Sequence, residues 1–360
     1  MDATMNSNSY RDPHKKVKVE FDRAPLSQRL KAKYLSFFFL KKVGWYLFRL
    51  ILLIGIAYVV IYPFITKIAG SVMSPEDFVD VTVLIIPKHF TFDTYTAIFN
   101  ELGYSEAFLN TFMLSVACAV IQTLSCCLIG YGLAKFKFKG AKYVFLAVIL
   151  TMIIPYRTLY SSIVSFFGNF DIRGPISSLV DGPGLFTLLG MAGLEDLYYG
   201  VNINNTYIPL ILLSAAGLAF KNGLYIFLLR QFFRGVPDEL EESAYIDGSG
   251  TIKTFISIIL PLSVPMMITV FLFSFSWQWT DIDYTGMFFT STKTKLLSNI
   301  VGIPASLALK AEDYAAGKNL YEAAIRNTCG LMIIAPLVVV YIFCQKFLVQ
   351  GIERSGLTAD

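Results

Sequence analysis

Few side chains in this sequence are of the kinds that enzymes use for catalysis or metal binding. The two histidines, His14 and His89, have no companion nucleophile or metal ligand near them in the sequence. The Gly-x-x-x-x-Gly-Lys-Ser/Thr pattern of a phosphate-binding loop is absent, so we do not expect the chain to bind ATP through such a loop. The cysteines all lie in apolar runs without metal-ligand spacing, which indicates packing; they are Cys118, Cys126, Cys127, Cys329 and Cys344. We therefore expect no catalytic residue, no metal site and no cofactor, and we interpret the chain as a non-enzyme.

The polar segment with the most informative spacing lies between two apolar runs. Pro237 suits a first helical position, where no amide donor is needed, and the acidic residues of 238–242 favour the positive end of a helix. Gly248 follows Asp247 and readily adopts the left-handed conformation that closes a helix. The pattern predicts a rigid helix of about 16 Å over residues 237–247, followed by a sharp turn.

The spacing in and after this helix resembles the EAA loop of bacterial ABC-importer permeases. On this resemblance we assign eight residues to coupling with an ATPase subunit: Glu242, Ser243, Ala244, Asp247, Gly248, Ile258, Leu260 and Pro261. Residues 227–241 resemble the carbohydrate branch of that family, the MalG type. Ser243 departs from the usual alanine, but serine is also small, so tight docking stays feasible.

This resemblance implies a mechanical role. In the family, the loop forms a coupling helix that sits in a cleft on an ATPase subunit. It implies a type I ABC-importer permease fold with six transmembrane helices. It also implies these partners: a second, MalF-like permease subunit, two ATP-binding cassette subunits that bind ATP and magnesium, an extracytoplasmic solute-binding protein, and a carbohydrate substrate, with an oligosaccharide favoured.

Composition independently indicates an all-α membrane protein. Of the 360 residues, 55% are hydrophobic and only 16% charged, against roughly 25% charged residues in soluble domains. The net charge of +4 does not indicate a nucleic-acid partner, because the basic residues lie in the N-terminal tail and at loop ends. The apolar runs predict six spans, at about residues 44–66, 107–134, 143–167, 207–229, 255–280 and 327–347.

The distribution of lysine and arginine predicts that both termini are cytoplasmic in a bacterial plasma membrane. The predicted parts are a basic cytoplasmic tail (1–42), a transmembrane permease domain (43–349) with a coupling loop (230–254) and an extracytoplasmic insertion (about 169–206), and a short cytoplasmic tail (350–360). The insertion is interpreted either as a plain loop or as an external platform for the solute-binding protein or the partner permease.

Five residues in or near the spans are candidates for the translocation pathway: Lys221, Arg157, Trp277, Gln278 and Trp279. A charge inside a span is costly and is usually directed at a partner or a water-filled path, although Lys221 and Arg157 could instead reach the head groups. Tryptophans at this depth suit stacking on sugar rings, or an interfacial aromatic belt.

Three alternative functions stay open: an ABC importer for another solute, a secondary transporter and a membrane enzyme. The EAA loop is shared across importer families, so the solute could be a peptide or a polyamine. A secondary transporter would work without an ATPase, and a membrane enzyme would need a polar catalytic cluster within the spans. Co-purification of an ATPase through the Glu242 loop separates these classes, and the ligand of the cognate solute-binding protein identifies the solute.

Overall fold

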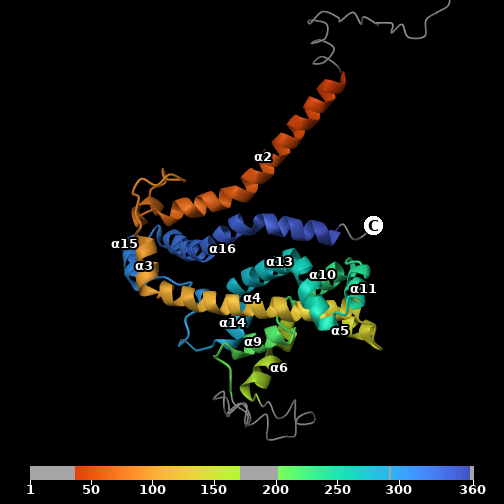
Figure 1. Cartoon of the computed structure of the whole chain (residues 1–360). Coiled ribbons are helices and arrows are strands. Elements are labelled where there is room, and N and C mark those ends of the chain that lie inside the picture. The colour runs from red at the N-terminus through yellow and green to blue at the C-terminus, as the bar shows by residue number, and fades with distance from the viewer. Residues whose placement is uncertain (1–36, 171–201, 292, 357–360) are drawn as a thin grey trace, which may run out of the picture. The chain divides into compact units, whose positions relative to one another are not determined.

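The computed structural model of the chain describes residues 37–170, 202–291 and 293–356, and within them the regular structure is helical apart from one antiparallel bridge between Met73 and Phe90 (Figure 1). The chain divides into two units, residues 1–65 and 66–360, which are described separately. The helices are α2 (Phe37–Ser71), η1 (Pro75–Phe78), α3 (Asp93–Glu101), α4 (Tyr104–Lys135), α5 (Ala141–Ile153), α6 (Tyr156–Gly168), α9 (Ile208–Ala215), α10 (Asn222–Arg234), α11 (Glu239–Ile246), α12 (Thr251–Thr254), η3 (Phe255–Ile259), α13 (Leu260–Trp279), α14 (Asp283–Phe288), η4 (Leu297–Asn299), α15 (Ala305–Asp313) and α16 (Lys318–Gly356). The predicted all-helical membrane fold is thus confirmed in the described residues.

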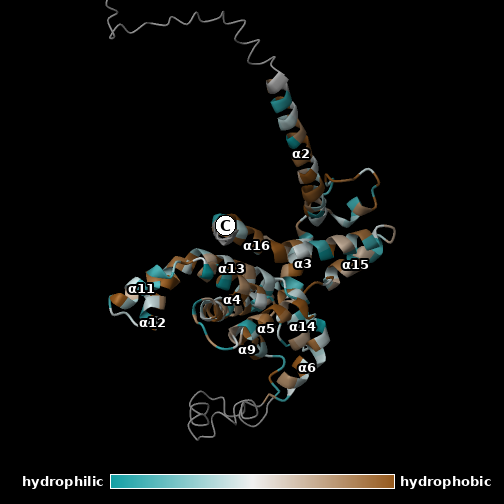
Figure 2. Cartoon of the chain, turned by 90° about the vertical axis from the view of Figure 1, so that its right-hand side faces the viewer, coloured by the Kyte–Doolittle hydropathy of each residue, from teal (hydrophilic) through white to brown (hydrophobic). Residues whose placement is uncertain are grey.

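The first unit consists, in its described part, of helix α2 up to Ile65. Hydrophilic residues lie near the start of α2, at Lys41 and Lys42, and hydrophobic residues cover most of the rest (Figure 2). Such a helix suits a lipid environment, because its backbone groups are bonded internally and its surface is apolar. Most of the predicted tail 1–42 lies outside the described residues.

Four described helices are long and apolar enough to cross a membrane: Lys41–Ser71, Tyr104–Lys135, Thr251–Trp279 and Lys318–Leu348. Helices α5 and α6 together form a fifth candidate, bent by 103° between them. The bend follows from Pro155, because proline has no backbone N–H to donate and disfavours helical geometry in the residue before it.

The predicted span at 207–229 is divided into α9 and α10, with a turn between them that we call the helix break, residues 216–221. Gly217 and Lys221 have positive φ values of 73° and 70°, which a continuous helix does not allow. The carbonyl of Ser214, freed by the break, accepts hydrogen bonds from the hydroxyl of Ser125 (2.8 Å) and the side-chain amide of Asn222 (3.3 Å). Broken helices persist in membranes where neighbouring polar groups satisfy the backbone in this way.

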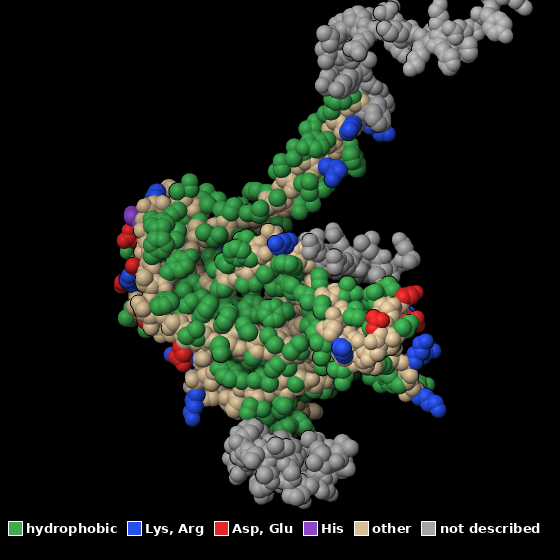
Figure 3. All heavy atoms as spheres, viewed as in Figure 1, with side chains coloured by type: hydrophobic (Ala, Val, Ile, Leu, Met, Phe, Trp, Pro, Cys, Tyr) green, Lys and Arg blue, Asp and Glu red, His purple; other side chains and the backbone are tan. Residues whose placement is uncertain are grey.

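Helix α4 is central to the packing of the second unit. It packs along α10 and α13, and Gly130 allows close approach, since a Cβ there would lie 3.0 Å from the backbone nitrogen of Arg230. Buried Gln122 joins three helices: its amide donates to Ser214 Oγ (3.1 Å) and its carbonyl oxygen accepts from Ser274 Oγ (2.6 Å). Hydrophobic side chains cover the middle of this unit in Figure 3, and charged side chains gather near α3 and α15 and near α11.

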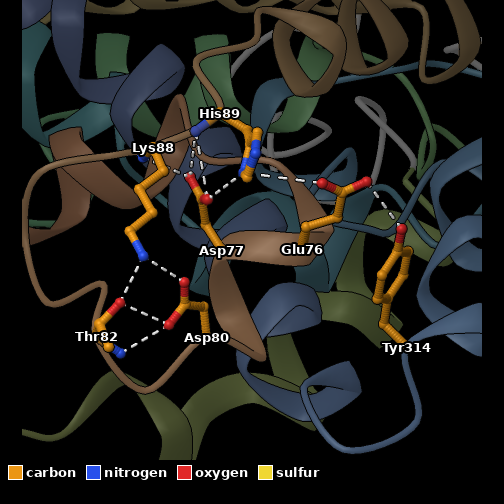
Figure 4. Close-up of polar contacts among 7 residues, drawn as sticks. All are labelled: Glu76, Asp77, Asp80, Thr82, Lys88, His89 and Tyr314. Carbon is orange, nitrogen blue, oxygen red and sulfur yellow. Dashed lines mark hydrogen bonds and ion pairs between the residues drawn. The ribbon is translucent and has the colours of Figure 1, made fainter.

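The segment before α3 is fixed by a buried carboxylate (Figure 4). The Asp77 side chain is fully buried and accepts hydrogen bonds from the backbone nitrogens of Lys88 and His89, both at 3.1 Å, and it lies 2.8 Å from His89 Nδ1. Tyr314 Oη donates to Glu76 (3.1 Å) and so ties this segment to the turn before α16. The loop is therefore structured by its own polar contacts.

Two further predicted parts lie partly outside the described residues. Residues 171–201 of the predicted insertion lie outside the described residues, as do residues 357–360 of the predicted C-terminal tail. The helix α16 continues to Gly356, beyond the predicted span.

Candidate functional site

The predicted short helix is present as α11, but it spans Glu239–Ile246 instead of 237–247, with Asp238 at the N-cap, so Pro237 precedes the helix. Its closing turn has the predicted geometry. Gly248 has φ +79°, and the backbone N–H of Ser249 donates to the carbonyl of Ala244 (2.9 Å) across this turn. A side chain at Gly248 would meet no atom within 4 Å, so the turn needs glycine for its backbone conformation and not for lack of space. Helix α12 then starts at Thr251.

The predicted coupling residues divide between an exposed face and a packed face. Glu242, Ser243, Asp247 and Gly248 are exposed, whereas Ala244 is buried against the rest of the chain. The hydroxyl of Ser243 donates to the carbonyl of Glu239 in its own helix (2.7 Å), so it needs no hydrogen-bond acceptor from a partner protein. The exposed residues therefore remain free for contact with another protein.

The residues after α11 lead into the long helix α13. Ile258 and Leu260 are partly buried against the core cluster formed by α4, α10 and α13. Residues 255–259 form a π-helical turn directly before Pro261, which has no N–H for the carbonyl of Ser257. This widened turn leads into α13, and residues 251–279 form one candidate membrane span.

Two α4 residues that the sequence did not reveal anchor α11. Tyr131 Oη donates to Glu241 Oε1 (2.9 Å), and both side chains are buried. Lys135 Nζ donates to the carbonyl of Val236 and to Asp238 Oδ1, both at 2.6 Å, and holds the pKa of Asp238 below its usual value. The Lys135 side chain is only 7% exposed, whereas the Asp238 side chain is 78% exposed, so the contact is shielded from water on the lysine side alone. The residues of each pair lie about 100 positions apart, so no local sequence pattern indicated that they meet.

The helix break brings together an aromatic cluster and a lysine. Phe220 lies at ring-centroid distances of 5.3 Å from Tyr156, 5.7 Å from Trp277 and 5.8 Å from Tyr284. Lys221 Nζ lies 4.6 Å from the ring centroids of both Phe220 and Trp277, within the range of cation–π attraction. The cluster thus joins the α5–α6 bend, the helix break and the end of α13.

Two cavities adjoin this cluster, and Phe220 and Tyr284 line both. The larger, about 240 Å³, is lined by Thr151, Met152, Ile153, Ile154, Pro155, Tyr156, Leu218, Ala219, Phe220, Lys221, Gly223, Leu224 and Tyr284. The smaller, about 20 Å³, is lined by Trp277 and Gln278 among others and has room for one water or hydroxyl. The buried amide nitrogen of Gln278 has no hydrogen-bond acceptor in the described part of the chain.

The five candidate pathway residues are separated by the structure. Arg157 lies beside the cluster and pairs with Asp283 (3.1 Å), while its Nε donates to Tyr156 Oη (2.9 Å). Trp279 is placed differently from the prediction: it is 2% exposed, and its indole N–H donates to the carbonyl of Ile333 (2.8 Å). It packs in the core between α4, α13 and α16 and lines neither cavity. Phe220, Tyr156 and Tyr284 complete the cluster and were not predicted.

Comparison with known proteins identifies the family to which this chain belongs. Residues 127–354 match the family described as "Binding-protein-dependent transport system inner membrane component". The arabinooligosaccharides transport system permease protein AraQ of Halalkalibacterium halodurans is 26% identical, over 84% of this chain and 92% of the relative. The galactooligosaccharides transport system permease protein GanQ of Bacillus subtilis is 28% identical, over 86% of this chain and 94% of the relative.

A third relative, the polygalacturonan/rhamnogalacturonan transport system permease protein YtcP of Bacillus subtilis, is 28% identical over 83% of this chain and 93% of the relative. Among solved structures, a chain of a bacterial ABC transporter involved in the import of the acidic polysaccharide alginate matches with a TM-score of 0.58 and 17% identity. That match covers 85% of this chain and 97% of the other and supports the fold alone. With the family matching residues 127–354, this chain belongs to the binding-protein-dependent transport system inner membrane components, the membrane-embedded permease subunits of ABC importers.

Proposed function

We propose that this permease moves a carbohydrate, of oligosaccharide size, through an ATP-driven importer. The names of three similar permeases support this substrate class, because they refer to arabinooligosaccharides, galactooligosaccharides and polygalacturonan/rhamnogalacturonan. The observation that supports the mechanism is the geometry of α11: an exposed face containing Glu242 and Gly248, and a packed face tied to α4.

In the proposed complex, the chain pairs with a second, related permease and sits on two ATPase subunits, which bind ATP and magnesium. An extracytoplasmic solute-binding protein delivers the substrate. The α11 end and both termini are cytoplasmic, and residues 169–206 are extracytoplasmic. Closure of the ATPases moves α11, and the π-helical turn and the bond to Tyr131 pass this motion to α13 and α4. The cavity between the permeases then alternates between outward and inward access.

The proposed solute path runs beside the helix break. Lys221, Trp277 and Gln278 line the two cavities there, and Trp277 is 47% exposed, so one face of its ring is available for stacking on a sugar. Arg157 flanks this region, where its pair with Asp283 fixes the start of α6 against α14. Trp279 supports the path only by packing.

The coupling role is tested with Gly248→Asp in the whole importer reconstituted in liposomes. The added side chain has space but forces an unfavourable left-handed backbone, at a cost on the order of 1–2 kcal/mol, and places a charge on the docking face. We expect insertion and assembly to persist while binding-protein-stimulated ATP hydrolysis and uptake are lost. Glu242→Lys should act in the same way.

Gly250→Asp is the matched control, because Gly250 also faces open space but has φ −79°, which aspartate accepts as a helix N-cap. This variant should retain stimulated hydrolysis. Normal uptake by Gly248→Asp and Glu242→Lys, or a purified complex without an ATPase subunit, would refute the proposed function.

A further inference from the structure

Lys221 combines two costly features at one position. It is a non-glycine residue with φ +70°, and it carries a partly exposed ammonium group on the turn that divides the predicted span at 207–229. Strained backbone conformations and intramembrane charges both concentrate at functional sites. The ammonium group is not needed to bond the freed carbonyl of Ser214, because Asn222 and Ser125 already do so.

The charge of Lys221 is stabilised but not neutralised. Its Nζ lies over the rings of Phe220 and Trp277, whose quadrupoles attract a cation without cancelling its charge. It forms no ion pair with a carboxylate in the part of the chain that the structure describes.

Both nearby carboxylates are otherwise engaged. Asp283 pairs with Arg157, and Asp281 accepts hydrogen bonds from the backbone nitrogens of Tyr284 (3.1 Å) and Thr285 (2.6 Å) at the start of α14. Burial raises the pKa of Asp281. Neither carboxylate therefore pairs with Lys221, and its positive charge stays available beside the larger cavity.

The cavity thus presents two kinds of group to a solute. Tyr156, Phe220 and Tyr284 offer apolar ring surface, and Lys221 offers an unpaired cation, in a volume of about 240 Å³. A neutral sugar would use the rings and leave the ammonium unpaired, whereas a sugar acid would use both. Resting on the proposed function, we infer that the transported saccharide is anionic and that Lys221 binds a carboxylate of a uronic acid unit beside the Phe220 ring.

The test uses the complete importer and reads the site directly, through Trp277 fluorescence. Sodium glucuronate, galacturonate and mannuronate are titrated against glucose, galactose and mannose, and the response of a Trp277→Phe complex is subtracted. We expect at least one uronate to perturb Trp277 about tenfold more tightly than its neutral hexose, since a charge-assisted contact is gained.

Lys221→Asn removes the charge while asparagine tolerates the left-handed backbone, so the fold is preserved. This variant should lose the preference for the uronate, and Lys221→Arg should retain most of it. Lys139→Asn, at an exposed lysine in the turn before α5, is the control and should match the wild type.

Equal responses to all three uronates and their hexoses would overturn the inference, as would an unchanged uronate preference in Lys221→Asn. The latter result would mean that Lys221 faces a carboxylate of the partner permease or a lipid phosphate. These outcomes are distinct from failure of the proposed function, which is judged by ATPase co-purification and by loss of stimulated hydrolysis in Gly248→Asp.

Discussion

Two lysines of the second unit differ in how their charge is paired. Lys135, at the end of α4, has both a carbonyl and a carboxylate oxygen at 2.6 Å, beside a buried Tyr131–Glu241 hydrogen bond. Lys221, at the helix break, has aromatic rings as its nearest partners and adjoins a cavity. The lysine of the α11 anchor has polar partners for its charge, as suits a part that transmits force, whereas the lysine of the helix break has no carboxylate partner in the described residues and so can bind one.

This difference means that the two regions should fail in different ways when mutated. Changes at the anchor should uncouple or loosen α11, and changes at the helix break should alter solute binding with little loss of stability. A third class of residue, in the core that supports both regions, should cause loss of the folded protein itself.

The largest expected effect separates Trp279 from Trp277. Trp279→Ala removes a buried indole and its hydrogen bond to Ile333, and should destabilise the protein by about 3–5 kcal/mol. Trp277→Ala removes a half-exposed ring and should cost less than about 1.5 kcal/mol, while solute uptake falls. Thermal unfolding of the purified complex, paired with uptake assays, distinguishes the two. Equal destabilisation by both would contradict the division between packing and binding at the end of α13.

A second prediction concerns how tightly the start of α10 packs against α5. A Cβ at Gly223 would lie 2.6 Å from Thr151 Oγ1 and 2.8 Å from Met152 Cγ, closer than the 3.0 Å contacts at Gly130. Gly223→Ala should therefore destabilise the protein by about 1–3 kcal/mol, and Gly130→Ala by less.

The control for this pair is Gly330→Ala, because Gly330 lies in α16 and a Cβ there meets nothing within 4 Å. Alanine should stabilise that helix by up to about 1 kcal/mol through its better helix propensity. Melting temperatures of the three variants give the ranking. If Gly223→Ala were as stable as Gly330→Ala, α10 and α5 would pack loosely at Gly223, and the cavity of about 240 Å³ beside it would be a result of that loose packing.

The local conformations could be predicted from the sequence because they depend on neighbouring residues. Gly248 after Asp247 specifies the left-handed turn, and the acidic run after Pro237 specifies the start of α11. The division of 207–229 was missed because averaged hydrophobicity is continuous across it. Gly217 was a usable signal, but the partners that stabilise the break, Ser125 and Gln122, lie on another helix.

The different positions of Trp277 and Trp279 could have been predicted from the sequence. Trp277 and Trp279 are two positions apart, so in an α-helix, at about 100° per residue, they lie on nearly opposite faces. Helical geometry alone predicts that both tryptophans cannot line one path. The Lys135–Asp238 pair was not predictable, because the sequence does not specify which of the lysines at 135, 137, 139 and 142 meets α11.

A third prediction tests the closed character of the anchor. Tyr131→Phe removes only a hydroxyl, but it leaves the buried carboxylate of Glu241 without that donor, at a cost of about 1–3 kcal/mol. Hydrogen exchange in α11 should become faster, and binding-protein-stimulated ATP hydrolysis should fall. Tyr245→Phe, at an exposed tyrosine of the same helix, should leave both unchanged. An α11 exchange rate that does not respond to Tyr131→Phe would show that this bond does not hold the helix.

The smallest effect is expected where a paired charge faces water. Lys310 pairs with Asp93 at 2.9 Å, both side chains are at least half exposed, and such pairs contribute at most about 1 kcal/mol. The hydrogen bond from Lys310 lowers the pKa of Asp93, so its contribution is full above the ordinary aspartate pKa of about 4 and is lost as the pH falls through the lowered value. The pKa of Lys310 is raised, so the contribution is also lost at strongly alkaline pH, above its ordinary value of about 10.

Lys310→Met should therefore lower the melting temperature slightly and by a constant amount between about pH 5 and pH 9, with the difference from wild type shrinking below about pH 4. Lys139→Met, at an exposed lysine, controls for loss of a surface charge. A large or pH-independent loss in Lys310→Met would show that solvent exposure does not set the value of a charge pair in this protein. The contrast between Lys135 and Lys221 would then have to be explained by something other than burial and bonding.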